Sequence, residues 1–137
     1  MIDRMSTSAR VEIRHDSDIV VARRRARELA LAQGLSTAAA EALATAVTEI
    51  ASNIVVHAQW GEIFIAATDQ PKRGVTVVAR DTGPGIHHVS QALQDGFSTG
   101  RGLGFGLSGA QRLVDEFEIE SVPGHGTVVT LKKWASS

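Results

Sequence analysis

Apolar residues recur along this chain with two periods, and each period predicts a different element. Alternating apolar and polar residues, or a run of β-branched residues, predict strands. The predicted strands cover residues 11–13, 62–68, 75–79, 117–121 and 127–132. Helical spacing predicts helices over residues 19–33, from 36 or 37 to about 57, over 89–94 and over 108–115. Residues 96–106 are too rich in glycine for regular structure.

Residues with capping chemistry precede the two long helices. Ser36 or Thr37 can cap the second helix, and the N-cap candidates of the first are Asp16, Ser17 and Asp18. Turn-forming residues at 69–74 join two predicted strands, which implies antiparallel pairing. The predicted fold is a single α/β domain over residues 1–137, a two-layer sandwich. Its sheet is mixed but mostly antiparallel, with the helices on one face.

Composition narrows the class of protein. The formal net charge of −1 predicts no general attraction to nucleic acid or to anionic membranes. The chain has no cysteine, which excludes disulfides and thiol chemistry. Residues 1–10 lack the apolar segment of a secretory signal, and no apolar run approaches the roughly 20 residues that span a bilayer. We therefore expect a soluble cytoplasmic protein with neither nucleic acid nor a membrane as a partner.

Three polar residues interrupt the apolar surface of the second long helix. Glu49, Asn53 and His57 follow one another at spacings of four, so they share one helical face. Carboxylate and amide oxygens are ligands that suit Mg²⁺ or a water molecule that it holds. An exposed polar edge on an amphipathic helix would show the same spacing, so this signal alone does not decide between the two.

A glycine-rich loop begins where the strand at 75–79 ends. Asp81 stands at that strand end, where a carboxylate can accept a hydrogen bond from an exocyclic amine such as that of adenine. Gly83 and Gly85 allow a ligand to approach the backbone closely. The alternative is a type II Pro-Gly turn, which Pro84 and Gly85 also fit.

Two further glycine clusters follow. Residues 100–106 carry glycine at every second position and lead into a helix, as a phosphate-binding loop would. The lysine of a P-loop is missing there, and no βαβ unit precedes it as a dinucleotide fingerprint requires. A flexible linker is the alternative. Residues 124–127 place the hydroxyl of Thr127 at the start of the last strand, although an ordinary hairpin turn has the same pattern.

Taken in order, these motifs resemble those of the GHKL ATPase superfamily, which is built on the Bergerat fold. The motifs are Glu49-x-x-x-Asn53, Asp81-x-Gly-x-Gly85, Gly102-x-Gly-x-Gly106 and Gly124-x-Gly-Thr127. The small size is similar to that of bacterial anti-sigma and switch kinases. The stretches that resemble RsbT-type switch kinases of stress-signalling complexes are residues 18–23, 95–100, 102–109 and 112–117.

The resemblance implies a role for each matching residue. Asn53 would hold a Mg²⁺ that bridges the ATP phosphates, and Glu49 would be the general base or orient the attacking hydroxyl. Asp81 would bind the adenine amine with support from Thr127. Gly83 and Gly85 would shape the adenine pocket. The segment implied to contact the phosphates as a lid comprises Arg101, Gly102, Leu103, Gly104, Phe105 and Gly106.

The function implied by the resemblance is a serine/threonine kinase that phosphorylates a STAS-domain regulatory protein in stress or sigma-factor signalling. A PP2C-type phosphatase would be a further partner. The main alternative is an anti-sigma factor that binds a sigma factor and phosphorylates its antagonist. A nucleotide switch without catalysis and a fragment of a sensor histidine kinase are weaker alternatives. Glu49 argues against the first, and the short segment before the first helix argues against the second.

Overall fold

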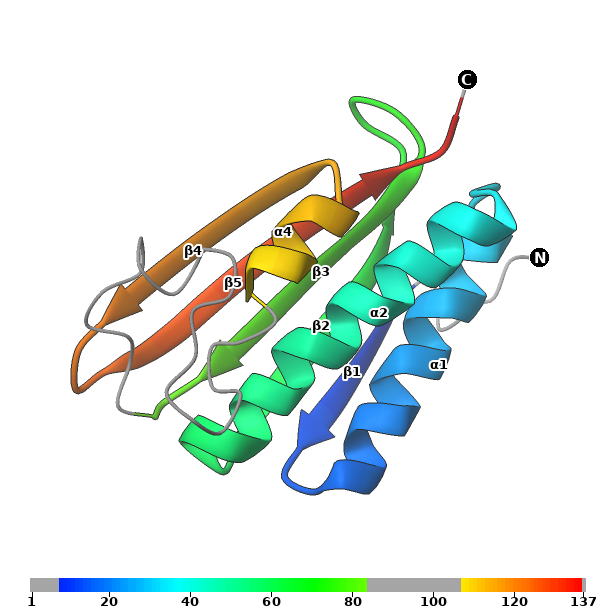
Figure 1. Ribbon diagram of the computed structural model, residues 1–137. Helices are drawn as coiled ribbons and strands as arrows, with labels where there is room; N and C mark the ends of the chain where they lie inside the picture. Colours follow the sequence, from blue (N-terminus) through cyan, green and yellow to red (C-terminus); the bar gives the residue numbers. More distant parts are fainter. Residues whose placement is uncertain (1–7, 84–106, 137) are drawn as a thin grey trace.

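The computed structural model describes residues 8–83 and 107–136, and its elements are coloured along the chain in Figure 1. Before the gap the order is a strand, two helices and two strands, and after it a short helix and two strands. The strands are β1 (Ser8–Ile13), β2 (Gly61–Thr68), β3 (Gly74–Asp81), β4 (Glu116–Val122) and β5 (Gly126–Trp134). The helices are α1 (Asp16–Ala32), α2 (Thr37–Asn53), the π-helical turn η2 (Ile54–Ala58) and α4 (Leu107–Leu113).

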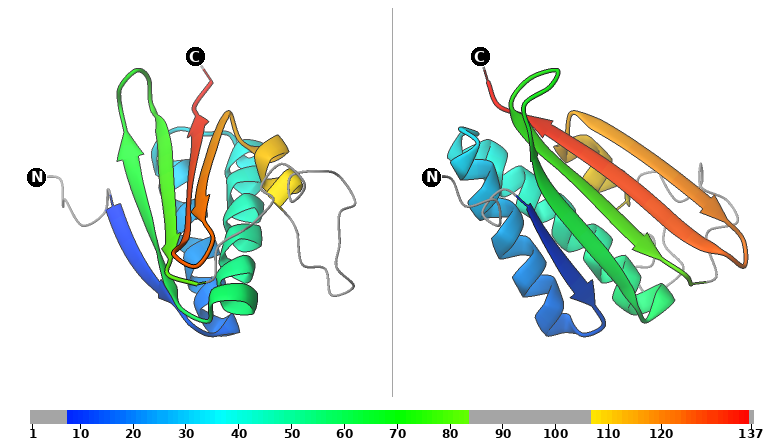
Figure 2. Two further views of the ribbon diagram at one scale, coloured as in Figure 1. Left: turned by 90° about the vertical axis from the view of Figure 1, so that its left-hand side faces the viewer. Right: turned by 180° about the vertical axis from the view of Figure 1, so that it is seen from behind.

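All five strands form one sheet in the order β1-β2-β3-β5-β4, and every pairing is antiparallel. The side views in Figure 2 place α1, α2 and α4 on the same face of this sheet. The prediction of a two-layer α/β fold with helices on one face is therefore confirmed. The helix predicted at residues 89–94 lies outside the described residues.

Alternation along the strands selects the face that the helices cover. In β3, Val75, Val77 and Ala79 are buried, and the residues that pair with the last two, Leu131 and Val129, are buried as well. The large side chains that complete this core from α2 and the first residue of η2 are at most 3% exposed: Leu43, Val47, Ile50 and Ile54. The core thus lies between α2 and the three central strands.

The N-cap of one long helix differs from the prediction, and that of the other is confirmed. The N-cap of α1 is His15 instead of one of the three candidates that follow it. Asp18 still serves that end, because its Oδ2 accepts hydrogen bonds from the backbone N–H groups of Arg14 (2.9 Å) and His15 (3.0 Å). These bonds lower the pKa of Asp18. Ser36 caps α2 as predicted, since its Oγ accepts from the N–H of Ala39 at 3.0 Å.

The segment Thr37–Ala58 has 22 residues and is apolar enough to cross a membrane by length and composition, which the sequence analysis did not recognise. In this fold it is the central core helix. Its apolar side chains pack against the sheet and its neighbour α1 lies alongside it, as Figure 1 shows. The core helix of a soluble protein meets the same criterion, so this segment is weak evidence for a membrane protein.

Candidate nucleotide site

A polar row crosses the helix-facing side of the sheet at one end of its strands. Asp81 lies opposite Gly61 on β2 and Thr127 on β5, and Thr127 lies opposite Ser121 on β4. The neighbouring row at the same face is entirely apolar and comprises Ile63, Ala79, Val129 and Ile119. The polar row therefore marks where the hydrophobic core ends and a polar ligand can begin.

Asp81 is held in a fixed orientation at the end of β3. Its Oδ1 accepts a hydrogen bond from the backbone N–H of Gly83 at 2.9 Å. Burial raises the pKa of this carboxyl, while the N–H groups of Gly83 and Thr127 and the nearby His57 imidazole oppose the rise. A half-buried acceptor that is already oriented suits recognition of an amine on a flat, mostly apolar ring.

The hydroxyl groups beside Asp81 form a pair. Thr127 Oγ1 and Ser121 Oγ lie 2.9 Å apart, and the Ser121 hydroxyl also donates to the carbonyl oxygen of Gly126 at 3.2 Å. Sequence analysis identified Thr127 but missed Ser121. The signal was present, because Ser121 is the polar residue on the strand face that Phe117 and Ile119 share, but only the register across the hairpin shows that it faces Thr127.

The π-helical turn η2, which continues helix α2, meets the loop that follows Asp81. The N–H of Gln59 bonds to the carbonyl of Ile54 at 2.8 Å and closes the turn, and Gln59 itself adopts a left-handed conformation with φ of 68°. Such π turns are rare and concentrate at functional sites. The turn brings Ala58 against Gly83, where an added Cβ would come within 2.6 Å of the Ala58 Cβ. Glycine at this position is therefore required by the close approach of the loop to the helix.

Asn53 is the last residue of α2 and sits next to this junction. Among the side chains of the described residues, its Nδ2 is the one buried polar atom that has no hydrogen-bond partner. An amide side chain can be rotated to exchange its nitrogen and oxygen, so the position offers either group. A buried amide without a partner is costly in the free protein, and a bound polar group would satisfy it.

Glu49 lies one turn before Asn53 in the regular part of α2. Both side chains therefore occupy one face of the helix, and both residues are partly exposed. Mg²⁺ is usually held by one or two protein oxygens together with substrate phosphates. Glu49 and Asn53 offer oxygens of this kind. Within residues 8–83 and 107–136, no group of three His, Cys, Asp or Glu side chains is placed to hold a metal by itself.

The remaining candidate residues fall in the part of the chain that the structure does not describe. They are Gly85, Arg101, Gly102, Leu103, Gly104, Phe105 and Gly106. The structure therefore brings together Asp81, Gly83 and Thr127 at the end of β3, and it places Asn53 at the end of α2 with Glu49 one turn before it. The contribution of residues 100–106 to phosphate binding stays a prediction.

Comparison with known proteins shows the family of this chain. The sequence profile of the histidine kinase-like ATPase domain matches residues 14–133. This chain belongs to that family. The match confirms the resemblance to GHKL ATPases. It covers the helix with Glu49 and Asn53, the strand end with Asp81, and the glycine clusters at residues 100–106 and 124–127.

Within the histidine kinase-like ATPase family, individual relatives are similar over most of the chain. The serine/threonine-protein kinase RsbT of Bacillus subtilis is 41% identical over 131 residues, which cover 95% of this chain and 98% of the relative. An anti-sigma F factor of a Thermoanaerobacter species is 34% identical over 68% of each chain. The anti-sigma F factor of Caldanaerobacter subterraneus is 36% identical over 66% of each chain.

Proposed function

We propose that this protein is an ATP-dependent serine/threonine protein kinase. The observation that carries the proposal is the oriented carboxylate of Asp81 at the end of β3, where η2 packs on the loop through Ala58 and Gly83. At the end of α2, the buried Nδ2 atom of Asn53 has no hydrogen-bond partner and is available to a ligand. The family match and the extent of the similarity to a serine/threonine kinase support it.

Each residue of the site has a proposed task. Asp81 accepts a hydrogen bond from the exocyclic amine of adenine, and Thr127, in contact with Ser121, supports that end of the pocket. Asn53 holds Mg²⁺ through its amide oxygen, and the metal neutralises phosphate charge when bound. Gly83 and Gly85 shape the adenine pocket, while the backbone N–H groups of residues 101–106 bind the phosphates.

Glu49 is the proposed catalytic residue. A serine or threonine hydroxyl of the protein substrate attacks the γ-phosphorus, the bond to the bridging oxygen breaks, and ADP leaves. The hydroxyl proton passes to the Glu49 carboxylate. Phosphoryl transfer depends mainly on positioning and charge neutralisation, so the contribution of this base should lie near the lower end of the usual range, about a hundredfold.

The proposed substrate is a STAS-domain regulatory protein in a cytoplasmic partner-switching system. A PP2C-type phosphatase is a second proposed partner, which the kinase would bind after it leaves its substrate. These assignments rest on the likeness to RsbT, which extends over nearly the whole chain.

Phosphotransfer to STAS-domain proteins from the same source, measured with γ-labelled ATP under single-turnover conditions, tests the proposal. The wild-type protein should label a serine or threonine of one of them. Glu49→Gln should bind ATP with unchanged affinity and transfer phosphate about a hundredfold more slowly. Glu28→Gln, an exposed change on α1, is the matched control and should behave as wild type. Absence of Mg-ATP binding by the wild type at millimolar concentration would refute the proposal.

A second candidate function is that of an anti-sigma factor. The observation in its favour is the similarity to anti-sigma F factors over about two thirds of the chain. The two functions share the nucleotide site and differ in the protein that is bound. Co-purification of a sigma factor with this protein in the presence of ATP would favour the second function, and transfer to a STAS-domain protein without sigma binding would favour the first.

A further inference from the structure

The backbone at Gly126 fixes the surroundings of the hydroxyl pair of Ser121 and Thr127. Gly126 has φ of 113°, and a Cβ added there would collide with the carbonyl oxygen of Asp81. Glycine is required at this position, because it lets the start of β5 approach the end of β3 closely. The carbonyl oxygen of Gly126 then lies 3.2 Å from the Ser121 Oγ atom, across the β4–β5 hairpin.

The proton of the Ser121 hydroxyl is directed to this carbonyl group. A carbonyl oxygen only accepts hydrogen bonds, so Ser121 is the donor in its contact with Gly126. A hydroxyl group has one proton, and Ser121 therefore has none left for Thr127. In the contact of 2.9 Å between the two hydroxyl oxygens, Thr127 is consequently the donor and Ser121 the acceptor.

Thr127 is left with acceptor capacity alone for a ligand. Its proton points to Ser121, and the lone pairs of its Oγ1 atom remain on the helix side of the sheet. Asp81 lies opposite Thr127 in the register, and its carboxylate, oriented by the Gly83 N–H, is an acceptor as well. This end of the site therefore combines two neighbouring acceptor groups, which suit a ligand that supplies donors.

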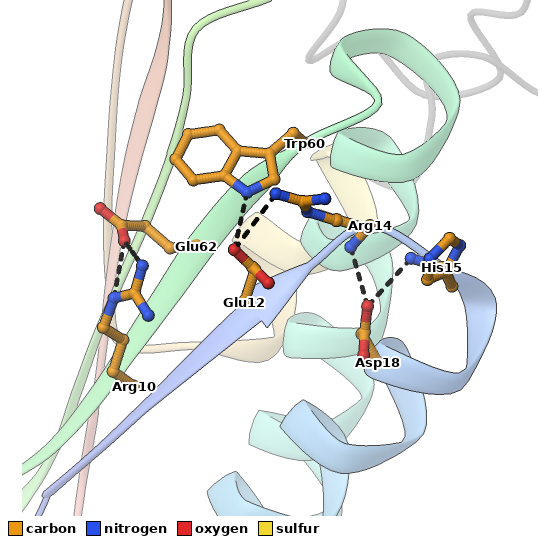
Figure 3. Close-up of polar contacts among 7 residues, drawn as sticks. All are labelled: Arg10, Glu12, Arg14, His15, Asp18, Trp60 and Glu62. Carbon is orange, nitrogen blue, oxygen red and sulfur yellow. Dashed lines mark hydrogen bonds and ion pairs between the residues drawn. The ribbon is translucent and has the colours of Figure 1, made fainter.

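Other carboxylates near this end of the sheet already serve donors of the protein itself. Glu62 accepts a hydrogen bond from the Arg10 guanidinium at 2.7 Å, and Glu12 accepts one from the Trp60 indole at 3.0 Å. Figure 3 shows both contacts. The two carboxylates alternate with buried residues of β1 and β2, so they lie on the sheet face away from the helices. Neither of them competes for a ligand on the helix side.

We propose that Ser121 is a positioning residue for nucleotide selection. By holding the Thr127 hydroxyl as an acceptor, it makes the site prefer a 6-amino purine nucleotide to a 6-oxo purine nucleotide. This inference rests on the proposed nucleotide site. The amine of adenine carries two N–H donors, which meet the acceptors directly or through one water molecule. Guanine and hypoxanthine carry a carbonyl oxygen at the same position, and acceptor then faces acceptor.

Thr127 without Ser121 would not discriminate in this way. A hydroxyl that is free to rotate both donates and accepts, so it would donate to a 6-oxo group as readily as it accepts from a 6-amino group. A hydroxyl whose proton is already used rejects the 6-oxo base, because two opposed acceptors both stay unpaired. Ser121 therefore acts on selectivity through Thr127 and needs no contact with the base.

Isothermal titration calorimetry with Mg-ATP and Mg-ITP tests the proposal, because the two bases differ only at the 6-position and the adjoining ring nitrogen. The wild type should bind ATP more tightly than ITP. Ser121→Ala releases the Thr127 proton, so the ratio of the two affinities should fall about fivefold, as expected for one neutral hydrogen bond. Ser121→Thr keeps a hydroxyl at this position and should retain the wild-type ratio.

Two further variants separate positioning from loss of structure. Thr68→Ala removes another strand hydroxyl that donates to a backbone carbonyl, at the opposite end of the sheet, and should leave the ratio unchanged. In a Thr127→Val background, Ser121→Ala should have no further effect on the ratio, because the hydroxyl through which Ser121 acts is missing there. Circular dichroism confirms that each variant is folded.

The outcomes distinguish this inference from the proposed function. An unchanged ratio in Ser121→Ala, or an equal loss of both affinities, would overturn the inference and leave the proposed kinase activity intact. A wild type that binds ITP as tightly as ATP would do the same. A wild type that binds neither nucleotide at millimolar concentration would refute the proposed function, and this inference with it.

Discussion

Replacing Asp81 with asparagine tests its proposed recognition of adenine separately from its effect on the stability of the fold. The Oδ1 atom of Asp81 accepts a hydrogen bond from the Gly83 N–H at 2.9 Å, and the Thr127 N–H also acts on this carboxylate. A carboxylate has two acceptor oxygens, so it can serve the backbone and a ligand together. Asparagine has one acceptor oxygen and cannot serve both. If it keeps the Gly83 contact, it presents an NH₂ group to the amine of adenine, and donor then faces donor.

The expected loss follows from the charge of the acceptor. A hydrogen bond to a charged group stabilises by about 1.5–3 kcal/mol. Each 1.4 kcal/mol corresponds to a tenfold change in affinity, so Asp81→Asn should weaken Mg-ATP binding about 10- to 150-fold. Isothermal titration calorimetry near pH 7.5 measures the change. For the wild type, affinity should also fall as the pH is lowered through the raised pKa of Asp81, because the protonated carboxyl is a poor acceptor.

Asp81→Asn should lower the affinity for ATP, but it should not lower the stability of the nucleotide-free protein. Burial raises the pKa of Asp81 above its ordinary value of 3.8, so the folded protein holds this proton more tightly than the unfolded chain does. Ionisation therefore costs stability, and the cost grows as the pH rises from about 3.8 through the raised pKa. Above that window the nucleotide-free Asp81→Asn variant should melt at the same temperature as wild type or higher. Below it the difference should vanish.

A second carboxylate provides the matched control for this prediction. Asp115 accepts a hydrogen bond from the Trp134 N–H at 2.7 Å, at the other end of the sheet. Asp115→Asn should leave ATP affinity unchanged. Wild-type affinity in Asp81→Asn would refute the adenine assignment, and a large loss of stability in that variant would show that the carboxylate is a structural group instead.

Three further predictions concern neighbouring parts of the fold. Gly83→Ala places a Cβ within 2.6 Å of that of Ala58, so urea unfolding should show a loss of about 1–3 kcal/mol and calorimetry a weaker ATP affinity. Asn53→Ala removes a buried amide that has no partner for its Nδ2, so the free protein should lose little stability while Mg-ATP affinity falls at least tenfold. In the wild type, Gln33 Nε2 donates hydrogen bonds to two backbone carbonyl oxygens, each at 3.0 Å. Gln33→Leu removes this donor, so urea unfolding should show a loss of about 2–4 kcal/mol in stability. The affinity for ATP should be unchanged.

The sequence by itself determined the fold class and the candidate residues at the strand end. The β-branched run at residues 75–79 predicts a buried strand, and Asp81 follows it as a polar residue at the strand end. Because Val78 is as apolar as its neighbours, the run does not say which side of β3 faces the core. The spacing of Glu49 and Asn53 fixes their common helical face before any tertiary contact forms. These features are local, because strand and helix periods depend only on neighbouring residues.

Contacts between distant segments were decided by the tertiary structure alone. The spacing of apolar and polar residues does not predict three features of the site. They are the π-helical turn after Asn53, the packing of Ala58 on Gly83, and the hydroxyl pair of Ser121 and Thr127. The composition of the sheet face opposite the helices was also decided only by the tertiary structure. Alternation along a single strand gives two faces, but only the placement of all three described helices on one side leaves Arg80, Val128 and Glu120 together on the other. Which faces are buried is a property of how elements pack, and packing depends on the whole chain.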